Sequence, residues 1–321
     1  MDYLNNIKFI GKGLKRPECV LIDPDNTLHV SDFRGGISRI KANGEINLIK
    51  PNNGFKIKPN GLTIIDKNSW LVTHLDEAEG GVYKLSFDGE IEPFLLKIEN
   101  KLMPPTNYVH FDYNGRIWIT VSTTKIPRIL SHNADCNDGF IILVEEGKSK
   151  IVADGLCFAN ECFYNPFDKK LYVNETFGKK ISSFEIGKNG KLINKKTLTS
   201  FNFGEFPDGL TLDCEGCFWV TSIFSNKVIR VLPNGEKQNI LEDNDPAHLN
   251  SIEVAYKKGI LTRSLMNVNK SKKLKNISSL AFGGKNLKDI YLGCLLGDEI
   301  GYFTYNIAGL KPAFWKNIYL N

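Results

Sequence analysis

Residues 207–221 read PDGLTLDCEGCFWVT, and this stretch decides the fold. A polar opening residue, Asp208, leads into a short apolar strand, and a turn rich in Asp and Gly follows. The stretch then ends in a second strand of aromatic and β-branched residues. The same second strand recurs five times, at residues 28–31, 70–73, 117–120, 171–174 and 290–293.

A third strand follows each of the six second strands, and in five copies a further Gly-containing turn leads to a fourth strand. Four strands at a period of roughly 40 to 50 residues are typical of a β-propeller blade. We therefore predict an all-β fold, a six-bladed β-propeller with four antiparallel strands per blade, and a single domain over residues 1–321. The last copy shows only three clear strands, so we expect residues 7–10 to complete it, with residues 314–320 as the competing candidate.

Composition agrees with this expectation and excludes other classes. The 321 residues are 42% hydrophobic, which is enough for a sizeable core. The net charge of +5 comes from scattered lysines, and the aromatic residues sit at core strand positions, so nucleic-acid binding is disfavoured. Residues 1–15 contain no apolar run long enough for a signal peptide or a membrane span, and we expect a cytoplasmic protein with no membrane partner.

The seven cysteines have no regular spacing, so we expect them to be reduced. Cys214 and Cys217 form a single Cys-x-x-Cys pair on a turn, and without a second pair a zinc site there is improbable. Cys157 and Cys162 are expected to pack as small apolar residues beside the channel.

The residue that opens each blade carries the functional prediction, because the first strands of a propeller line its central channel. The openings contain two carboxylates and three amides, followed by a serine pair: Glu18, Asp208, Asn60, Asn107, Asn160 and Ser278-Ser279. Such a ring of oxygen atoms suits one divalent cation. Calcium fits best, and magnesium or manganese also fits the ligand types.

Each of these residues alone is better explained by a hydrogen bond to the local backbone. Taken together, however, five polar groups crowded into one channel are costly to desolvate, and two carboxylates there repel each other. A bound cation relieves both costs.

The ordered set of motifs around Glu18, Asn107, Asn160, Asp208 and residues 281–284 resembles the gluconolactonase, regucalcin and luciferin-regenerating enzyme family. The resemblance runs from residue 18 to residue 302. It implies a six-bladed propeller with one catalytic divalent metal in the channel that hydrolyses a sugar lactone to the aldonic acid. We expect calcium to be the bound metal, and magnesium, manganese, zinc and iron are the alternatives.

Position by position, the resemblance implies that Glu18, Asn160 and Asp208 bind the metal and that Asn107 contacts the substrate, the metal or both. The metal polarises the lactone carbonyl, and Asp208 is the expected general base on water, although Glu18 and Asp208 could exchange roles. Three residues depart from the family pattern: Pro105 replaces a substrate-binding Arg, Tyr108 replaces an Asp, and Glu161 replaces a Gly.

The loops after the second strands are expected to form the substrate pocket on the face of the openings. The candidates for substrate contact are Asn60, Asn107, His74, Glu175 and Arg128. Two long segments, residues 122–139 and 243–276, fall on that face and are either lids or surface insertions. Asp245 followed by Pro246 predicts the start of a short helix in the second of them. His29 and His110 lie inside strands and are expected to be structural.

Two other functions stay open. A phosphotriesterase or aryl-ester hydrolase would use the same scaffold, and a non-catalytic interaction propeller would use its rim. We expect a monomer or weak oligomer, because a closed ring has no structural need of a partner.

Overall fold

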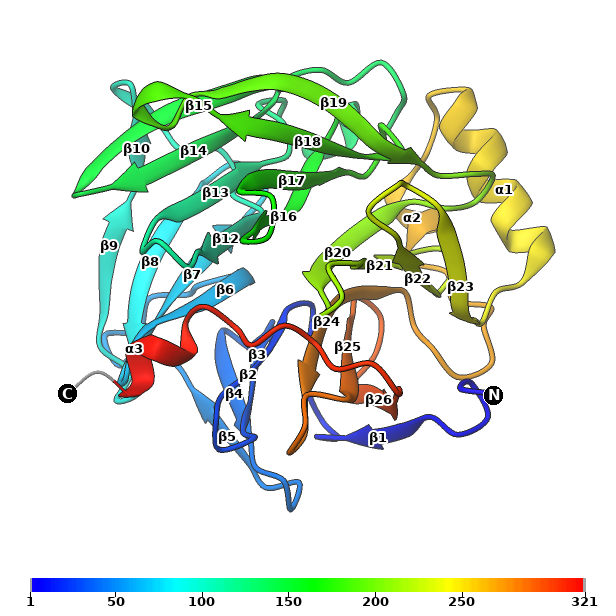
Figure 1. The fold of residues 1–321 in the computed structure, drawn as a ribbon, viewed down its shortest axis with the longest axis horizontal. Helices are drawn as coiled ribbons and strands as arrows, with labels where there is room; N and C mark the ends of the chain where they lie inside the picture. Colours follow the sequence, from blue (N-terminus) through cyan, green and yellow to red (C-terminus); the bar gives the residue numbers. More distant parts are fainter. Residues whose placement is uncertain (1, 320–321) are drawn as a thin grey trace.

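Residues 2–319 are described by a computed structural model, in which six four-stranded antiparallel sheets stand around a central axis (Figure 1). The fold is therefore the predicted six-bladed β-propeller. The blades in chain order contain β2 (Val20–Ile22), β3 (Leu28–Asp32), β4 (Gly36–Ile40) and β5 (Ile46–Ile49); β6 (Pro59–Asp66), β7 (Ser69–Leu75), β8 (Gly80–Ser86) and β9 (Ile91–Leu95); β12 (Tyr108–Phe111), β13 (Ile117–Val121), β14 (Gly139–Glu145) and β15 (Lys148–Leu156); β16 (Ala159–Asn165), β17 (Lys170–Glu175), β18 (Lys180–Ile186) and β19 (Leu192–Ser200); β20 (Pro207–Leu212), β21 (Phe218–Ser222), β22 (Lys227–Val231) and β23 (Lys237–Glu242); β24 (Ile277–Gly283), β25 (Asp289–Cys294), β26 (Ile300–Thr304) and β1 (Lys8–Ile10).

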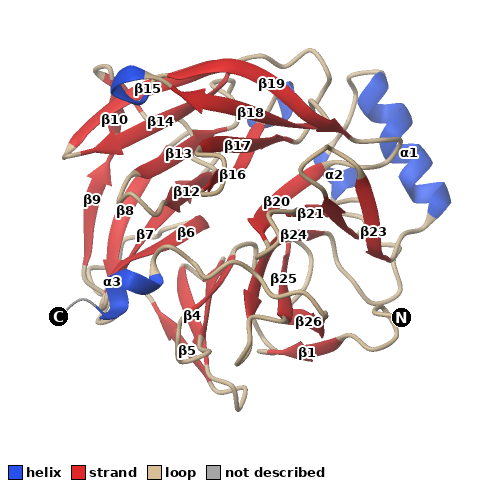
Figure 2. Cartoon of the chain, in the orientation of Figure 1, coloured by secondary structure: helices blue, strands red, loops and turns tan. Residues whose placement is uncertain are grey.

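Helix α1 lies at the outer edge of the ring (Figure 2). The elements outside the blades are the helices α1 (Pro246–Lys257), α2 (Arg263–Met266) and α3 (Trp315–Tyr319), the 3-10 turns Arg128–Ser131 and Lys188–Gly190, and the small ribbon of β10 (Lys97–Ile98) and β11 (Lys101–Leu102). Within residues 2–319, no helix has the length and apolar character needed to cross a membrane.

The N-terminal strand closes the ring as expected. β1 pairs with β26 in antiparallel register, with Lys8 opposite Tyr302 and Ile10 opposite Ile300. The competing C-terminal candidate instead forms helix α3, while its last residue, 320, lies outside the described residues. The edge that β26 would otherwise expose is thereby covered by a strand from the start of the chain.

Asp and Trp residues fix the first hairpin of two blades. The indole nitrogens of Trp118 and Trp219 donate to the turn residues Asp112 and Asp213 at 2.8 and 2.9 Å. Both tryptophans are fully buried, so each donor needs such a partner. His29 links the first two blades in the same way, because its Nδ1 accepts from the indole of Trp70 at 3.0 Å. The expectation that His29 is structural is confirmed.

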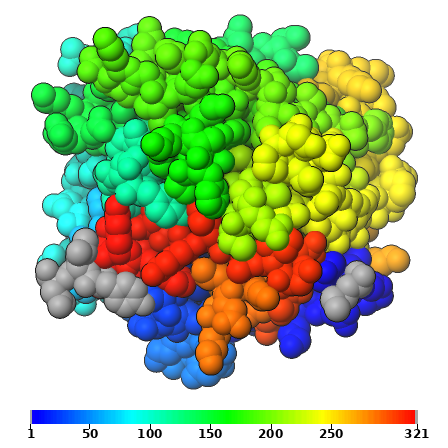
Figure 3. Space-filling model, in the orientation of Figure 1, coloured from blue at the N-terminus to red at the C-terminus, as the bar shows by residue number. Residues whose placement is uncertain are grey.

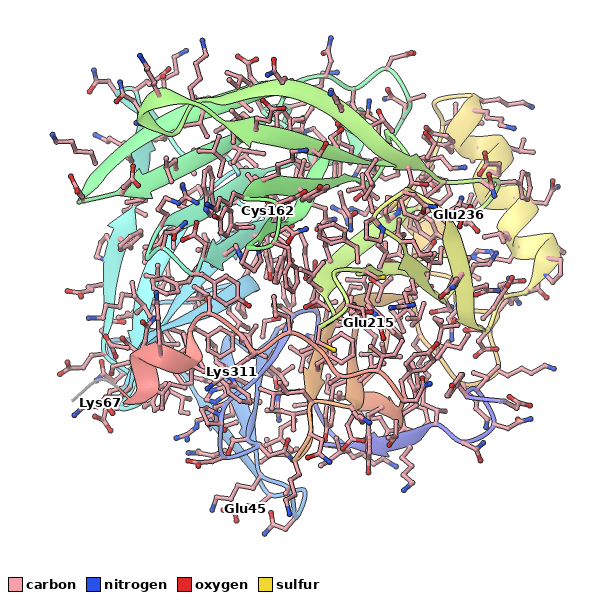
Figure 4. The ribbon with its side chains drawn as sticks, viewed as in Figure 1. Glu45, Lys67, Cys162, Glu215, Glu236 and Lys311 are labelled. Atoms are coloured by element: carbon pink, nitrogen blue, oxygen red, sulfur yellow. A yellow bond between two sulfur atoms is a disulfide. The ribbon has the colours of Figure 1, made fainter. Side chains whose placement is uncertain are left out.

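The C-terminal segment crosses the end of the ring that is remote from the opening residues. It lies over the first hairpins, since Leu310 N donates to Leu212 O at 2.9 Å and the indole of Trp315 donates to Ile22 O at 2.7 Å. In the space-filling view this segment, coloured red, runs across the middle of the face (Figure 3). Lys311, labelled in Figure 4, belongs to it, and its carbonyl accepts from the hydroxyl of Tyr113 at 2.6 Å.

Candidate functional site

The opening residues of all six blades meet at one pocket on the ring axis. The pocket has a volume of about 10 Å³, which is close to the size of one water molecule or ion. Its lining consists of the openings and the residues that follow them: Glu18, Cys19, Asn60, Gly61, Asn107, Tyr108, Asn160, Glu161, Asp208 and Ser278. The structure thus brings together Glu18, Asn60, Asn107, Asn160 and Asp208, which the sequence places far apart.

A repeated irregularity in the first strands shapes this pocket. The pairing of the first two strands shifts register at Pro59/Leu62, Ala159/Cys162, Pro207/Leu210 and Ile277/Leu280. In a regular strand, successive side chains point to opposite faces, whereas a bulge redirects one of them. Asn160 and Glu161, which are neighbours in sequence, both line the pocket for this reason.

Polar side chains at the ends of the second strands hold the openings in place. The Thr221 hydroxyl accepts from Gly209 N at 2.8 Å and donates to Ser278 O of the next blade at 2.6 Å. Thr73 does the same, because it accepts from Gly61 N at 2.8 Å and donates to Asn107 O at 2.9 Å. Each bond ties one blade's opening to its neighbour, so the second-strand residues position the pocket without entering it.

Three carboxylates share the pocket, one more than the sequence pattern predicted. Burial, together with the neighbouring Glu18 and Glu161, raises the pKa of Asp208 well above its usual value. Burial also raises the pKa of Glu161 to about 8, although Leu210 N donates to its Oε2 at 2.8 Å. Glu18 forms an ion pair with Arg16 Nη2 at 2.6 Å. The pocket therefore disfavours negative charge unless a cation is present.

Several oxygen atoms of the pocket have no hydrogen-bond donor. Asn60 donates through Nδ2 to Asn107 O at 2.9 Å, while the Oδ1 atoms of both residues are buried and unpaired. Glu18 Oε2 differs from these two atoms, because it has a charged partner in Arg16 Nη2 at 2.6 Å. Unpaired buried acceptors of this kind are the ligands that a hard cation such as Ca²⁺ prefers.

The residue types in the pocket thus fit a divalent cation. Residues 2–319 contain no group of three His, Cys, Asp or Glu side chains arranged to hold a metal. A cation here would consequently depend on asparagine oxygens as well as carboxylates. Asn160 is adjacent, since its Nδ2 donates to Thr176 Oγ1 at 3.0 Å and contacts Asp208 Oδ1.

Two of the predicted substrate-contact residues lie away from this pocket. The imidazole Nδ1 of His74 accepts from Lys58 N at 3.0 Å, and its ring packs against Phe55. The Glu175 carboxylate accepts from Cys157 N at 2.7 Å and forms an ion pair with Lys195 at 2.9 Å. Both side chains are buried in these contacts.

Arg128 lies in the mouth above the pocket, on the predicted face. It belongs to the 3-10 turn Arg128–Ser131 in the long third-blade segment, and its Nη2 donates to Ser122 Oγ at 3.0 Å. Its guanidinium lies 5.0 Å from the centre of the Phe158 ring. This side chain is buried, and it lines a hollow of about 470 Å³.

The two long segments pack together on this face. Helix α1 begins after Asp245, which accepts from His248 N at 2.7 Å, as predicted. Its Tyr256 packs on Phe177, and His132 of the other segment stacks on the same ring. Arg128 from the first segment and Arg263 from the second line the same hollow.

The expectation that all cysteines are reduced is wrong for one pair. Cys136 and Cys157 form a disulfide, with their Cα atoms 4.8 Å apart. Cys136 lies in the long segment 122–139, and that segment folds back onto the turn that precedes Asn160. Sequence spacing could not show this, because the approach depends on the path of an insertion. The other five cysteines, which include Cys162 on β16 (Figure 4), are free thiols.

Sequence reasoning missed three residues that shape this site: Glu161, Arg16 and Arg263. Glu161 carried a signal, since it occupies a position where the family pattern has Gly. Arg16 directly precedes the Pro17-Glu18 opening, so its proximity to Glu18 could have been expected. Arg263 lies in an insertion outside the repeat, where periodicity gives no position.

Solved structures of several propeller proteins are similar to this chain. They include a gluconolactonase from Xanthomonas campestris (15% identity, TM-score 0.68, 94% of this chain and 91% of that chain). The calcium-binding protein regucalcin from Agrobacterium tumefaciens is 14% identical, with a TM-score of 0.67 and coverage of 95% and 96%. A luciferin-regenerating enzyme is 16% identical, with a TM-score of 0.68 and coverage of 96% and 98%.

At these identities the similarity of the structures establishes the fold alone. The sequence adds independent evidence, because residues 16–243 match the SMP-30/gluconolactonase/LRE-like region. The matched segment covers more than half of the chain and contains five of the six blade openings. The chain belongs to the SMP-30/gluconolactonase/LRE-like family.

Proposed function

We propose that this protein is a metal-dependent hydrolase that opens a sugar lactone to the aldonic acid. The observation that carries the proposal is the pocket on the axis, where two predicted carboxylate ligands and unpaired amide oxygens meet. Membership of a family that includes gluconolactonases supports a lactonase-type activity. The calcium-binding regucalcin among the similar structures supports Ca²⁺ as the first metal to test.

Glu18, Asn160 and Asp208 would hold the cation, with Asn107 as a further oxygen ligand. When bound, the cation supplies Lewis-acid polarisation of the lactone carbonyl. Glu18 suits a purely ligating role, because its ion pair with Arg16 fixes the carboxylate. Asn60 and Asn107 present their free Oδ1 atoms to the same space and would orient the substrate or the attacking water.

Asp208 is the general base in this proposal. A carboxylate accepts a proton only when it is ionised, and burial beside Glu18 and Glu161 raises the pKa of Asp208. Its ionisation at neutral pH therefore depends on compensating positive charge in the pocket. Once ionised, it takes a proton from the water that adds to the acyl carbon. It then returns that proton to the ring oxygen as the acyl C–O bond breaks.

The mouth above the pocket would receive the rest of the sugar. Arg128 lines it, and this position supports a role in substrate contact. His74 and Glu175 are not part of this proposal, because backbone and lysine groups occupy their polar atoms.

The test combines metal binding with a substrate panel. Purified protein is titrated with Ca²⁺, Mg²⁺ and Mn²⁺ by calorimetry, and a pH-indicator assay follows sugar lactones, aryl esters and organophosphates. We expect lactone turnover that EDTA abolishes, and loss of both turnover and Ca²⁺ binding in Asp208→Asn. The matched control is Asp88→Asn, because Asp88 is an exposed carboxylate on a turn at the opposite end of the ring. If the protein hydrolyses aryl esters or organophosphates but no lactone, it is an ester or phosphotriester hydrolase and the lactonase proposal is wrong. An active Asp208→Asn enzyme would refute the proposed site.

A further inference from the structure

The mouth above the pocket is strongly basic. Two adjoining hollows of about 670 and 470 Å³ share Arg16, Phe33, Arg263 and Asn267 in their linings. Their size is that of small-molecule sites. Six cationic and three acidic side chains line them: Lys15, Arg16, Lys58, Arg128, Arg263 and Lys275, with Asp76, Glu77 and Asp298.

The acidic side chains do not neutralise the arginines. Asp76 pairs with Lys58, and Arg16 pairs with Glu18 of the axial pocket. Within residues 2–319, neither Arg128 nor Arg263 forms an ion pair with a carboxylate. Among the described residues, the only side-chain hydrogen bond of Arg128 goes to the neutral hydroxyl of Ser122.

Arg128 has hydrogen-bonding capacity that the fold does not use. The residue is 8% exposed, and its buried Nε has no hydrogen-bond partner. A buried guanidinium donor without an acceptor is costly, and an anion that enters the hollow would remove that cost. Burial and the nearby Arg263 lower the pKa of Arg128 to about 9, so the side chain stays charged at neutral pH.

Arg16 completes the arrangement and connects it to the axial pocket. Its guanidinium contacts Glu18 at 2.6 Å, so the basic mouth begins directly at the pocket where the lactone carbonyl would bind.

We propose that the substrate is an anionic lactone, whose carboxylate or phosphate group binds to Arg128 and Arg263 in the mouth while its acyl group reaches Asp208. This inference rests on the proposed lactonase function and adds a substrate class to it. Arginine suits the role, because its planar guanidinium binds carboxylate and phosphate oxygens in pairs. The assay described next distinguishes a carboxylate from a phosphate on the lactone.

The assay compares three lactones of one sugar at equal concentration: the neutral aldonolactone, its 6-phosphate and the lactone whose C6 is a carboxylate. We expect kcat/KM to be highest for an anionic lactone, and the better of the two anions identifies the natural group. In Arg263→Gln, the ratio of kcat/KM for the anionic lactone to that for the neutral lactone should fall by roughly 10- to 100-fold, since one charge-assisted hydrogen bond is lost. Added salt should raise KM for the anionic lactones.

Two variants control the interpretation. Lys285→Gln removes the same charge from an exposed turn at the opposite end of the ring and should leave the ratio unchanged. Arg128→Gln changes a buried side chain and could disturb packing, so the exposed Arg263 provides the decisive variant. Hydrolysis of all three lactones at similar rates, or an unchanged ratio in Arg263→Gln, would overturn the anion site while leaving the lactonase intact.

A separate readout applies if no lactone is hydrolysed, which would refute the proposed function. The anion site is then judged by calorimetric titration with inorganic phosphate. Binding that weakens in Arg263→Gln but not in Lys285→Gln would support it. Absence of phosphate binding at millimolar concentration would overturn it.

Discussion

Glu161→Gln should stabilise the metal-free protein at neutral and alkaline pH. Glu161 is buried in the axial pocket, where its pKa is raised from its usual 4.5 to about 8. The unfolded chain loses this proton near pH 4.5, whereas the folded protein keeps it up to about pH 8. Stability contributed by the protonated carboxyl is therefore fully present below pH 4.5 and is lost as the pH rises toward 8.

The size of the effect follows from the two pKa values. Linkage between protonation and folding lowers the free energy of unfolding of the wild type by about 1 kcal/mol at pH 5 and by about 4 kcal/mol at pH 8. The two conditions therefore differ by about 3 kcal/mol. Glutamine does not titrate, and its amide oxygen can still accept from Leu210 N, which lies 2.8 Å from Glu161 Oε2 in the wild-type protein. The advantage of Glu161→Gln over the wild type should therefore grow with pH.

Urea unfolding in EDTA at pH 5 and pH 8 measures this difference. The matched control is Glu236→Gln, since Glu236 is an exposed turn residue, labelled in Figure 4. The difference in unfolding free energy between Glu236→Gln and the wild type should be the same at both pH values. A difference between Glu161→Gln and the wild type that does not change with pH would refute the reasoning. So would a variant that is less stable than the wild type at pH 8.

Three further predictions concern the fold. Thr221→Val should lower the free energy of unfolding by roughly 1–3 kcal/mol in urea titrations, because Ser278 O loses its donor, while Thr221→Ser should retain most of the stability. Burial lowers the pKa of His110 to about 4, so the unfolded chain binds the proton first and unfolding should become easier as pH falls from 6.5 to 4. Urea titrations should show that His110→Gln flattens this dependence. Truncation after residue 306 should lower the melting temperature in calorimetry, because it removes the contacts of Leu310 and Trp315 with the first hairpins; an unchanged melting temperature would contradict the structural role of the segment.

The repeated parts of the fold could be predicted from the sequence, because each blade repeats the same local physics. Apolar strands and Gly-containing turns mark the hairpins, and strand β1 was expected from the need to cover the last blade's edge. Helix α1 was also predictable, since Asp245 and Pro246 form a favourable helix start. The meeting of Asn160 and Asp208 at the axis followed from their equivalent positions in the repeat.

The missed features depend on contacts that no repeat specifies. Glu161 enters the pocket because a bulge at Ala159/Cys162 redirects the strand, and a pattern of alternating residues does not reveal a bulge. The position past the second strand suggested substrate contact for Glu175, yet Cys157 N and Lys195 bind its carboxylate. The disulfide of Cys157 likewise depends on how a long insertion returns to the ring.

Glu161 also bears on the charge of the proposed cation. Glu18 and Asp208 together carry two negative charges when ionised, which a divalent cation and Arg16, the ion-pair partner of Glu18, compensate. A third ionised carboxylate adds a further negative charge to a buried pocket, where it repels the other two carboxylates and is costly to desolvate. In the metal-free pocket the raised pKa of Glu161 disfavours this added charge at neutral pH, because the protonated carboxyl adds an oxygen to the pocket without adding a charge. The departure from Gly at this position is thus compatible with a divalent cation, and it makes the pocket's charge depend on pH.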